Sequence, residues 1–207
     1  MAPSGRVFLL SPAKAGGPRY DMLLRERASF DLAVKLRQGA ATIGEVYAFI
    51  SGLYFRGKMA YAETFRAAPP GIPSALVIVP GAGLVPPETP VVIEQLRTIA
   101  TIPVDEGNPQ YRDALTAAAK LLDHHAGPAC LYVLLGSVAS GKYTIPLLET
   151  FGERLLFPAD FVGRGDMSRG GLMLRCARSG TELSYIPVAG AVRHGARPPK
   201  LERWRRP

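Results

Sequence analysis

Residues 131–141 read LYVLLGSVASG, a run of five apolar residues that stops at Gly136 and leads to a second glycine at Gly141. Such a continuous apolar run is typical of a strand that is buried on both faces of a sheet. The residues that follow, 140–151, are predicted to form a helix. A buried strand that passes through a short glycine-containing turn into a helix is the repeating unit of α/β proteins. This stretch therefore decides the predicted fold class.

The same alternation extends in both directions along the chain. Further strands are predicted at 7–10, 75–79, 102–104 and 155–157, and further helices at 20–37, 42–50, 53–65, 90–99 and 109–125. A last pair of strands, 172–176 and 183–188, is predicted to form a hairpin around 178–181. We therefore expect a three-layer α/β sandwich with a mainly parallel sheet and a C-terminal antiparallel hairpin at one edge.

Composition limits the class of protein. Of the 207 residues, 47% are hydrophobic and 20% are charged, which suits a single α/β domain over 1–190 and excludes a wholly disordered chain. No apolar run approaches the roughly 20 residues that span a bilayer, and the N-terminus lacks the apolar segment of a signal peptide. Cys130 and Cys176 are too few for a disulfide scaffold or a four-cysteine zinc site, so a cytoplasmic location is expected.

The C-terminal segment 191–207 differs from the rest of the chain. Residues 193–207 hold five Arg and one Lys against one Glu, which accounts for +5 of the formal net charge of +8. A basic tail of this kind can neutralise the phosphates of DNA or RNA, and Trp204 within it can stack on a base. A solvated terminus that aids solubility is the alternative interpretation, and the sequence leaves both open.

Candidate ligand positions follow from the predicted topology, because open parallel sheets bind ligands beyond the carboxyl ends of their strands. The loops at those ends are 11–14, 80–83, 105–108, 136–140 and 158–160. Ser11 and Lys14 are candidate ligands for a substrate phosphate. Asp105 is a candidate acid/base group, although a carboxylate in this position also commonly caps the following helix.

Residues 136–142, GSVASGK, match the G-x-x-x-x-G-K spacing of a phosphate-binding loop between a strand and a helix. Glycines let the backbone approach an anion, and the lysine reaches terminal phosphates. Tyr143, however, stands where this motif needs Ser or Thr to bind Mg²⁺. Three interpretations stay open. The segment could be a nucleoside-triphosphate site. It could instead be a turn that binds another anion or a ribose or a base, or it could be a plain structural turn. The candidate ligands here are Gly136, Ser137, Ser140, Gly141 and Lys142.

Two further segments combine cations with flexible or aromatic neighbours. Residues 163–171, GRGDMSRGG, offer Arg164, Ser168 and Arg169 to an anion, with Asp166 as a second candidate acid/base group. The alternative interpretation is a flexible connector into the hairpin. In the helix 53–65, Tyr54 and Lys58 share one face, where they could stack a base and pair a phosphate, or simply form the rim of a helix packed on the sheet.

No pattern typical of a metal centre or of a G-x-S-x-G hydrolase occurs in the sequence. His124 and His125 end a predicted helix, where they suit its negative dipole end better than a metal. We therefore predict no metal site, and the sequence assigns neither a cofactor nor an oligomeric state.

Three short segments carry proline or glycine near the predicted strand ends: Ser11-Pro12 at the first strand end, 79–88 (VPGAGLVPPE) after the second, and 102–104 before an acidic turn. They resemble parts of the α/β domain of archaeosine synthases, which are relatives of tRNA-guanine transglycosylases, and parts of small uncharacterised bacterial proteins. The resemblance implies chemistry on a nucleobase or a tRNA, and it assigns no catalytic residue.

Together, these features predict a protein that binds a nucleotide, nucleoside or nucleobase, with transferase or glycosidic-bond chemistry on that ligand. One alternative is a non-catalytic nucleic-acid-binding protein that uses its basic tail. The other is a Mg²⁺-dependent nucleotide-binding enzyme that uses residues 136–142 as a phosphate loop.

Overall fold

A computed structural model describes residues 5–201, whose strands form one six-stranded sheet in the order β3-β2-β1-β4-β5-β6. The strands are β1 (Gly5–Leu10), β2 (Ala75–Val79), β3 (Gly83–Val85), β4 (Cys130–Leu135), β5 (Leu155–Pro158) and β6 (Tyr185–Pro187). The four strands β2, β1, β4 and β5 run parallel, whereas β3 and β6 pair antiparallel at the two edges. The predicted α/β fold with an antiparallel pair at one edge is confirmed.

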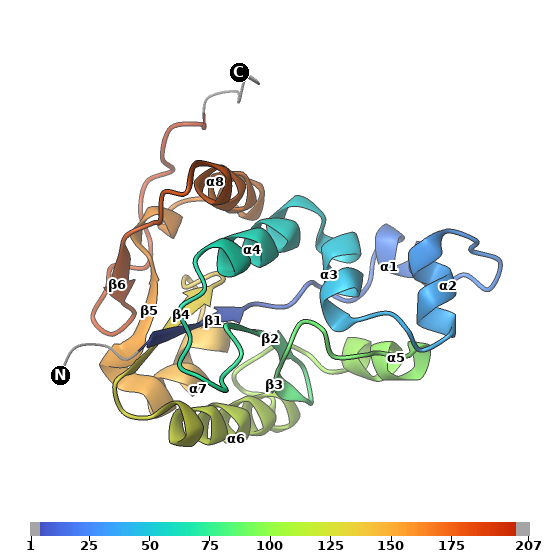
Figure 1. The fold of residues 1–207 in the computed structure, drawn as a ribbon, viewed down its shortest axis with the longest axis horizontal. Coiled ribbons are helices and arrows are strands. Elements are labelled where there is room, and N and C mark those ends of the chain that lie inside the picture. Colours follow the sequence, from blue (N-terminus) through green and yellow to red (C-terminus); the bar gives the residue numbers. More distant parts are fainter. Residues whose placement is uncertain (1–4, 202–207) are drawn as a thin grey trace.

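Helices cover both faces of this sheet (Figure 1). They are α1 (Pro18–Leu23), α2 (Asp31–Arg37), α3 (Ile43–Ser51), α4 (Leu53–Thr64), α5 (Ile93–Thr101), α6 (Pro109–Ala126), α7 (Gly141–Phe151) and α8 (Asp166–Ser179), with short 3₁₀ turns at Gly152–Arg154 and Ala159–Phe161. Helices α4 and α8 lie over one face, and α6 and α7 lie over the other. Helices α1, α2, α3 and α5 gather beyond the end at which β1 stops.

Apart from Gly5 and Arg6 at the start of β1, the central strands are apolar because both of their faces are covered. The side chains of residues 7–10 in β1 and 132–135 in β4 are completely buried. These two strands pair in register from Gly5 with Cys130 to Leu10 with Leu135. Both therefore end at the same level, which places Ser11 and Gly136 next to each other at the carboxyl edge of the sheet.

Two helix starts form as their sequences predict. In α3, the backbone N–H of Glu45 donates to Oγ1 of Thr42 at 3.3 Å, and Oε2 of Glu45 accepts from the N–H of Thr42 at 2.9 Å. This reciprocal pair is a capping box. In α6, Asn108 accepts from the N–H of Gln110 at 3.2 Å, and Pro109 occupies the first turn, where no N–H is needed.

Several local expectations are wrong. Residues 102–104 form an extended loop after α5 instead of a strand, and the predicted helix 20–37 is two helices, α1 and α2, separated by residues 24–30. Strand β3 was not predicted, because a segment of three residues is too short to show a periodicity.

The predicted hairpin contains one strand and one helix. Residues 172–176 belong to α8, and the strand β6 pairs with β5 instead. The buried residues of α8 are Arg169, Gly170, Met173 and Cys176, whose spacing of three and four is that of a helix face. The glycine-rich segment 163–171 was interpreted as a loop or a flexible connector, but α8 already begins at Asp166 and runs to Ser179, where Gly180 in the left-handed conformation caps it.

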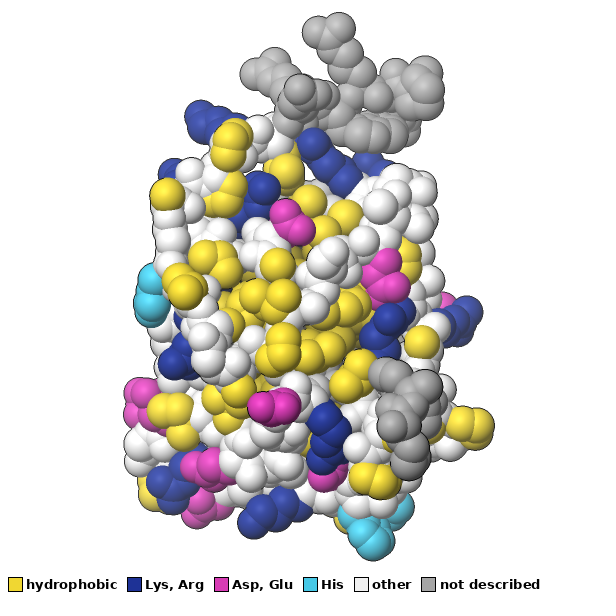
Figure 2. Space-filling view, turned by 90° about the vertical axis from the view of Figure 1, so that its left-hand side faces the viewer, with side chains coloured by type: hydrophobic (Ala, Val, Ile, Leu, Met, Phe, Trp, Pro, Cys, Tyr) yellow, Lys and Arg dark blue, Asp and Glu magenta, His cyan; other side chains and the backbone are white. Residues whose placement is uncertain are grey.

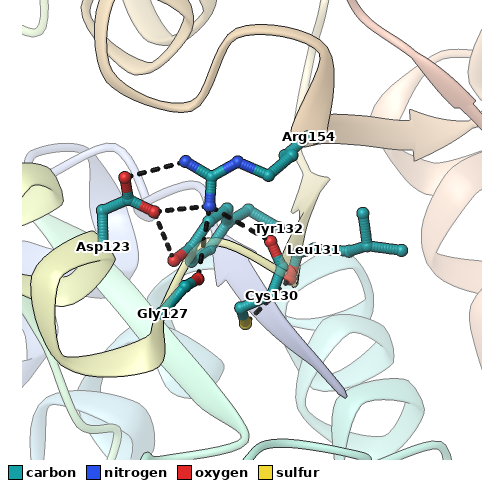
Figure 3. Close-up of polar contacts among 6 residues, drawn as sticks. All are labelled: Asp123, Gly127, Cys130, Leu131, Tyr132 and Arg154. Carbon is teal, nitrogen blue, oxygen red and sulfur yellow. Dashed lines mark hydrogen bonds and ion pairs between the residues drawn. The ribbon is translucent and has the colours of Figure 1, made fainter. Parts of the chain in front are cut away.

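An ion pair fixes the opposite end of the sheet, where β4 begins (Figure 3). The guanidinium of Arg154 holds both carboxylate oxygens of Asp123 at 2.7 and 2.8 Å, and the hydroxyl of Tyr132 donates to the same carboxylate at 2.9 Å. Burial alone raises the pKa of Asp123, but the hydrogen bonds from Arg154 and Tyr132 outweigh it and hold that pKa below its ordinary value. This cluster joins α6, β4 and the turn before β5.

The surface beside β6 carries apolar side chains. Figure 2 shows hydrophobic side chains gathered in the middle of the face on which this edge of the sheet lies. Ile186 of β6 and Val192 are 36% and 77% exposed. Within residues 5–201, no helix combines the length and the apolar character that crossing a membrane requires.

Candidate functional site

A cavity of about 770 Å³ opens at the carboxyl edge of the sheet, between the ends of β1 and β4. After β1 the next parallel strand, β2, lies on one side of β1, whereas after β4 the next strand, β5, lies on the opposite side of β4. The connections that follow these two neighbouring strands therefore lead in opposite directions across the sheet. In open α/β sheets, this reversal leaves a crevice in which ligands bind. Its walls come from residues 11–16, from Ile50, Ser51 and Tyr54, from Ile99, Ala100 and residues 102–104, and from Lys142 and Tyr143, together with Pro80, Ser137 and Asp166.

Six of the residues singled out from the sequence line this one cavity. They are Ser11, Lys14, Tyr54, Ser137, Lys142 and Asp166. They come from four separate segments of the chain, and the parallel topology brings them together. Two cations, two hydroxyls, a phenol ring and a carboxylate therefore face one space.

Lys58 lies behind this lining, on α4, and is buried, with 1% of its surface exposed. Its Nζ atom is 2.6 Å from Oγ of Ser11 and 2.8 Å from the carbonyl oxygen of the same residue. It also lies 3.9 Å from the centre of the Tyr54 ring. Within residues 5–201, no carboxylate forms an ion pair with Lys58.

The burial of Lys58 has an electrostatic consequence. Loss of hydration lowers the pKa of its amine to about 7, and the positive charges of Arg169 and Lys142 act in the same direction. The carboxylate of Asp166 opposes this shift without cancelling it. Near neutral pH, a substantial fraction of the Lys58 side chain is therefore an uncharged amine.

Two buried tyrosines form the aromatic part of the wall. Burial raises the pKa of Tyr54 to about 12 and also raises the pKa of Tyr143, so both phenols stay protonated at neutral pH. The hydroxyl of Tyr54 has no hydrogen-bond partner among the described residues. A buried polar group without a partner is unfavourable, so a polar ligand atom or a water beside it would be stabilised.

The turn 136–142 has the predicted position between β4 and α7, but its surroundings do not suit a phosphate at the helix N-terminus. A Cβ atom on Gly141 would lie only 2.7 Å from Oε1 of Glu106, so that carboxylate rests against the first residue of α7. A negative charge beside this helix N-terminus repels a phosphate that would bind there. Gly136, Ser140 and Gly141 lie outside the cavity lining.

Asp105 also lies outside this lining. It is exposed, and its Oδ1 atom accepts a hydrogen bond from the backbone N–H of Gly107 at 2.9 Å. The carboxylate thus closes its own turn before α6, whose N-cap is Asn108, so Asp105 neither caps that helix nor faces the cavity.

The segment 163–171 does not form a loop in which cations converge. Arg164 donates to the carbonyl oxygen of Asp160 at 2.9 Å and to Oγ of Ser168 at 3.3 Å. Arg169 is buried, donates to the carbonyl oxygen of Phe161, and has its Nη1 atom 3.5 Å from Oδ1 of Asp166. These contacts brace the start of α8, and neither arginine lines the cavity.

A close approach of α4 and α8 was missed from the sequence. A Cβ atom on Gly57 would lie 2.7 Å from the carbonyl oxygen of Gly170, and one on Gly170 would lie 2.7 Å from the Cα atom of Tyr54. Only glycines allow the two backbones to come this near. Glycine inside a helix is unfavourable unless packing requires it, and that is the signal that could have found the pair.

A second cavity, of about 400 Å³, adjoins the first. The two cavities share Pro80, Ile99 and Ile102 in their walls. The second is lined largely by apolar side chains and by the predicted strand-end loop 80–82. The crevice therefore has a polar part next to Ser11 and an apolar extension along β2 and α5.

The basic tail begins on the body of the protein. Nη1 of Arg193 donates to Oγ1 of Thr144 in α7 at 3.1 Å, and the backbone of Ala196 lies against Gly163. Trp204 and the arginines after it lie outside the described residues.

Comparisons with protein families, with curated proteins and with solved structures find no match for this chain. The resemblance to archaeosine synthases thus stays an expectation from three short segments. Within residues 5–201, no group of three or more His, Cys, Asp and Glu side chains is placed to hold a metal ion. The function is therefore inferred from the cavity.

Proposed function

We propose that this protein binds a nucleoside, a nucleobase or a nucleotide in the cavity between β1 and β4 and acts on it as an enzyme. The observation that carries the proposal is the set of side chains that meet there: Lys14, Lys142, Ser11, Ser137, Tyr54 and Asp166. Cations suit a phosphate, hydroxyls and a carboxylate suit a ribose, and aromatic and apolar walls suit a base. The volume of about 770 Å³ is that of an ordinary small-molecule site.

The position of Glu106 favours a ligand with few phosphates. Its carboxylate lies against Gly141, where a phosphate loop would hold the β- and γ-phosphates. This arrangement supports a nucleoside, a base or a nucleoside monophosphate over a nucleoside triphosphate. Of the two candidate acid/base groups, Asp166 is preferred because it lines the cavity and Asp105 does not. Chemistry at a bond to the nucleoside, by group transfer or at the glycosidic bond, is the reaction class proposed.

A thermal-shift screen tests this function. Nucleobases, nucleosides and mono- to triphosphates are added to the purified chain, with and without Mg²⁺, and one class is expected to raise the melting temperature by mass action. Lys14→Ala and Lys142→Ala should each weaken that ligand about 10-fold, since each removes a charge that faces the cavity. Lys120→Ala, on the exposed side of α6, is the matched control and should bind normally.

Two outcomes would contradict the proposal. One is the absence of a shift with every base, nucleoside and nucleotide. The other is a shift with polynucleotides only, lost in high salt and on removal of residues 198–207, a truncation that keeps the contact between Arg193 and Thr144.

A further inference from the structure

The contact between Ser11 and Lys58 has the geometry of a nucleophile and its base. The two atoms, Oγ of Ser11 and Nζ of Lys58, are 2.6 Å apart, and Ser11 lines the cavity while Lys58 lies behind it. A serine hydroxyl is a weak nucleophile unless a neighbouring base takes its proton, and lysine is one of the bases that does so in enzymes. The amine has no carboxylate partner among residues 5–201 that would keep it charged.

We propose that Ser11 is a catalytic nucleophile activated by Lys58, and that the protein breaks an ester or amide bond that joins an acyl group to a nucleoside or nucleotide. The nucleoside part of this substrate rests on the proposed function above. The acyl part rests on the adjoining apolar cavity, whose walls at Pro80, Ile99 and Ile102 continue those of the first. A substrate with a polar head and an apolar acyl group fills both parts of the crevice.

The hydrogen bonds are consistent with an uncharged amine. One N–H of Lys58 donates to the carbonyl oxygen of Ser11 at 2.8 Å, which orients the amine. A charged amine also donates to Oγ of the same serine at 2.6 Å, and once the amine is uncharged the same contact lets the hydroxyl donate its proton to the lone pair of Nζ. Gly136 makes room for this side chain, since a Cβ atom there would lie 2.9 Å from Cβ of Ser11.

The reaction balances without an oxidant or a further cofactor. Oγ of Ser11 forms a bond to the carbonyl carbon as its proton moves to Nζ of Lys58. The bond between that carbon and the nucleoside oxygen or nitrogen then breaks, and the leaving atom takes the proton from Lys58. Water hydrolyses the resulting serine ester, with Lys58 again accepting a proton and returning it to Ser11.

Charged groups from two neighbouring helices act on Lys58. Asp166 and Arg169 act from α8 and Lys142 from α7, while Tyr54 of its own helix lies against Nζ and Tyr143 of α7 lies near Tyr54 and Ser11. The two neighbouring cations favour the uncharged amine, and Asp166 favours the charged one. Both phenols are protonated and uncharged at neutral pH, so burial remains the main cause of the lowered pKa of Lys58.

A covalent probe tests this inference without any nucleotide. Diisopropyl fluorophosphate, a small electrophile, loses fluoride to an activated serine, and intact-mass spectrometry with peptide mapping locates the adduct. On the full chain we expect one adduct, at Ser11, whose rate of formation rises with pH through a midpoint near 7. The adduct should be absent in Ser11→Ala. In Lys58→Met the rate should fall about 100-fold or more, the contribution of a general base.

Two further variants separate a base from a merely positioning charge. Lys58→Arg keeps a cation beside Ser11 but supplies no lone pair, so its labelling should be as slow as that of Lys58→Met. Lys120→Met, an exposed lysine on α6, is the matched control and should label like the unaltered protein. Circular dichroism and the melting temperature establish that each variant is folded.

The inference is overturned by three results: no adduct at Ser11 at any pH up to 9, a rate with no inflection between pH 6 and 8, or rapid labelling of Lys58→Arg. The pH profile needs no variant, so it decides the matter even where a substitution prevents folding. Added nucleosides and nucleotides separate the two proposals. If a nucleoside or nucleotide slows the labelling of Ser11, both the proposed function and the nucleophile are supported. If none slows it while the labelling of Ser11 still depends on Lys58, the nucleophile is supported and the nucleoside ligand is refuted.

Discussion

Replacing Lys58 with methionine should change how the stability of the protein depends on pH. Lys58 is buried, with its pKa lowered from 10.5 to about 7 in the folded chain. Between these two values, the unfolded chain binds a proton at this lysine and the folded chain does not. The free energy of unfolding therefore rises with pH in this window, because unfolding takes up a proton. Methionine of similar length removes the titrating group and with it this contribution.

The expected magnitude follows from the two pKa values. The slope approaches its ceiling of about 1.4 kcal/mol per pH unit in the middle of the window and is about half that at pH 7, where the folded amine is half protonated. From pH 7 to pH 9, the contribution of Lys58 to the free energy of unfolding should thus rise by about 2 kcal/mol. Below pH 7 the full destabilising effect of burying the amine is present, and near pH 10.5 it has disappeared.

Urea denaturation of both proteins at pH 7, 8 and 9 measures this effect. Other groups titrate in the same range, but they do so in both proteins, so the difference between the two isolates Lys58. The unaltered chain should gain about 2 kcal/mol relative to Lys58→Met over this range. Parallel stability profiles of the two proteins would refute the reasoning, since they would mean that Lys58 has the same pKa folded and unfolded.

Three further substitutions test the packing described above. Gly57→Ala should lower the free energy of unfolding by about 1 to 3 kcal/mol in urea denaturation, because the added methyl group meets the backbone of Gly170; an unchanged midpoint would contradict this close approach. Thr42→Ala should lower it by about 1 kcal/mol through loss of the capping box, and equal stability would show that the box contributes nothing. Arg154→Met should lower the melting temperature and shift it more at pH 7 than at pH 3, where Asp123 of the unfolded chain is protonated and the stabilisation from its lowered pKa is partly lost; an equal shift at both pH values would argue against the ion pair.

Much of the fold could be predicted because its central elements depend on local patterns. The buried strands β1, β2 and β4 are continuous apolar runs, and α3 and α6 start at recognisable caps. The errors lie where pairing with distant residues decides the structure. Residues 172–176 have apolar character that suits a strand or a helix, and only the packing of α8 on α4 selects the helix. β3 exists because β2 offers it a partner.

The candidate site was predictable to the extent that topology determines it. The rule for strand ends predicts that Ser11 and Ser137 lie at one edge of the sheet, and both line the cavity there; Lys142 was predicted from the G-x-x-x-x-G-K spacing. It could not show that the side chains of Asp105 and Arg164 form hydrogen bonds with nearby backbone groups. Nor could it show that Lys58 reaches Ser11, since that contact depends on how α4 crosses the sheet.

The glycine contact between α4 and α8 also has a consequence during synthesis of the chain. Ser11 and Lys58 precede α8 in the chain, so they leave the ribosome before the helix that packs over Lys58. A nascent chain that ends before α8 leaves that amine in contact with water, where it stays charged and unable to accept a proton. Such a chain would therefore hold both residues of the pair without their reactivity, which arises only when α8 docks.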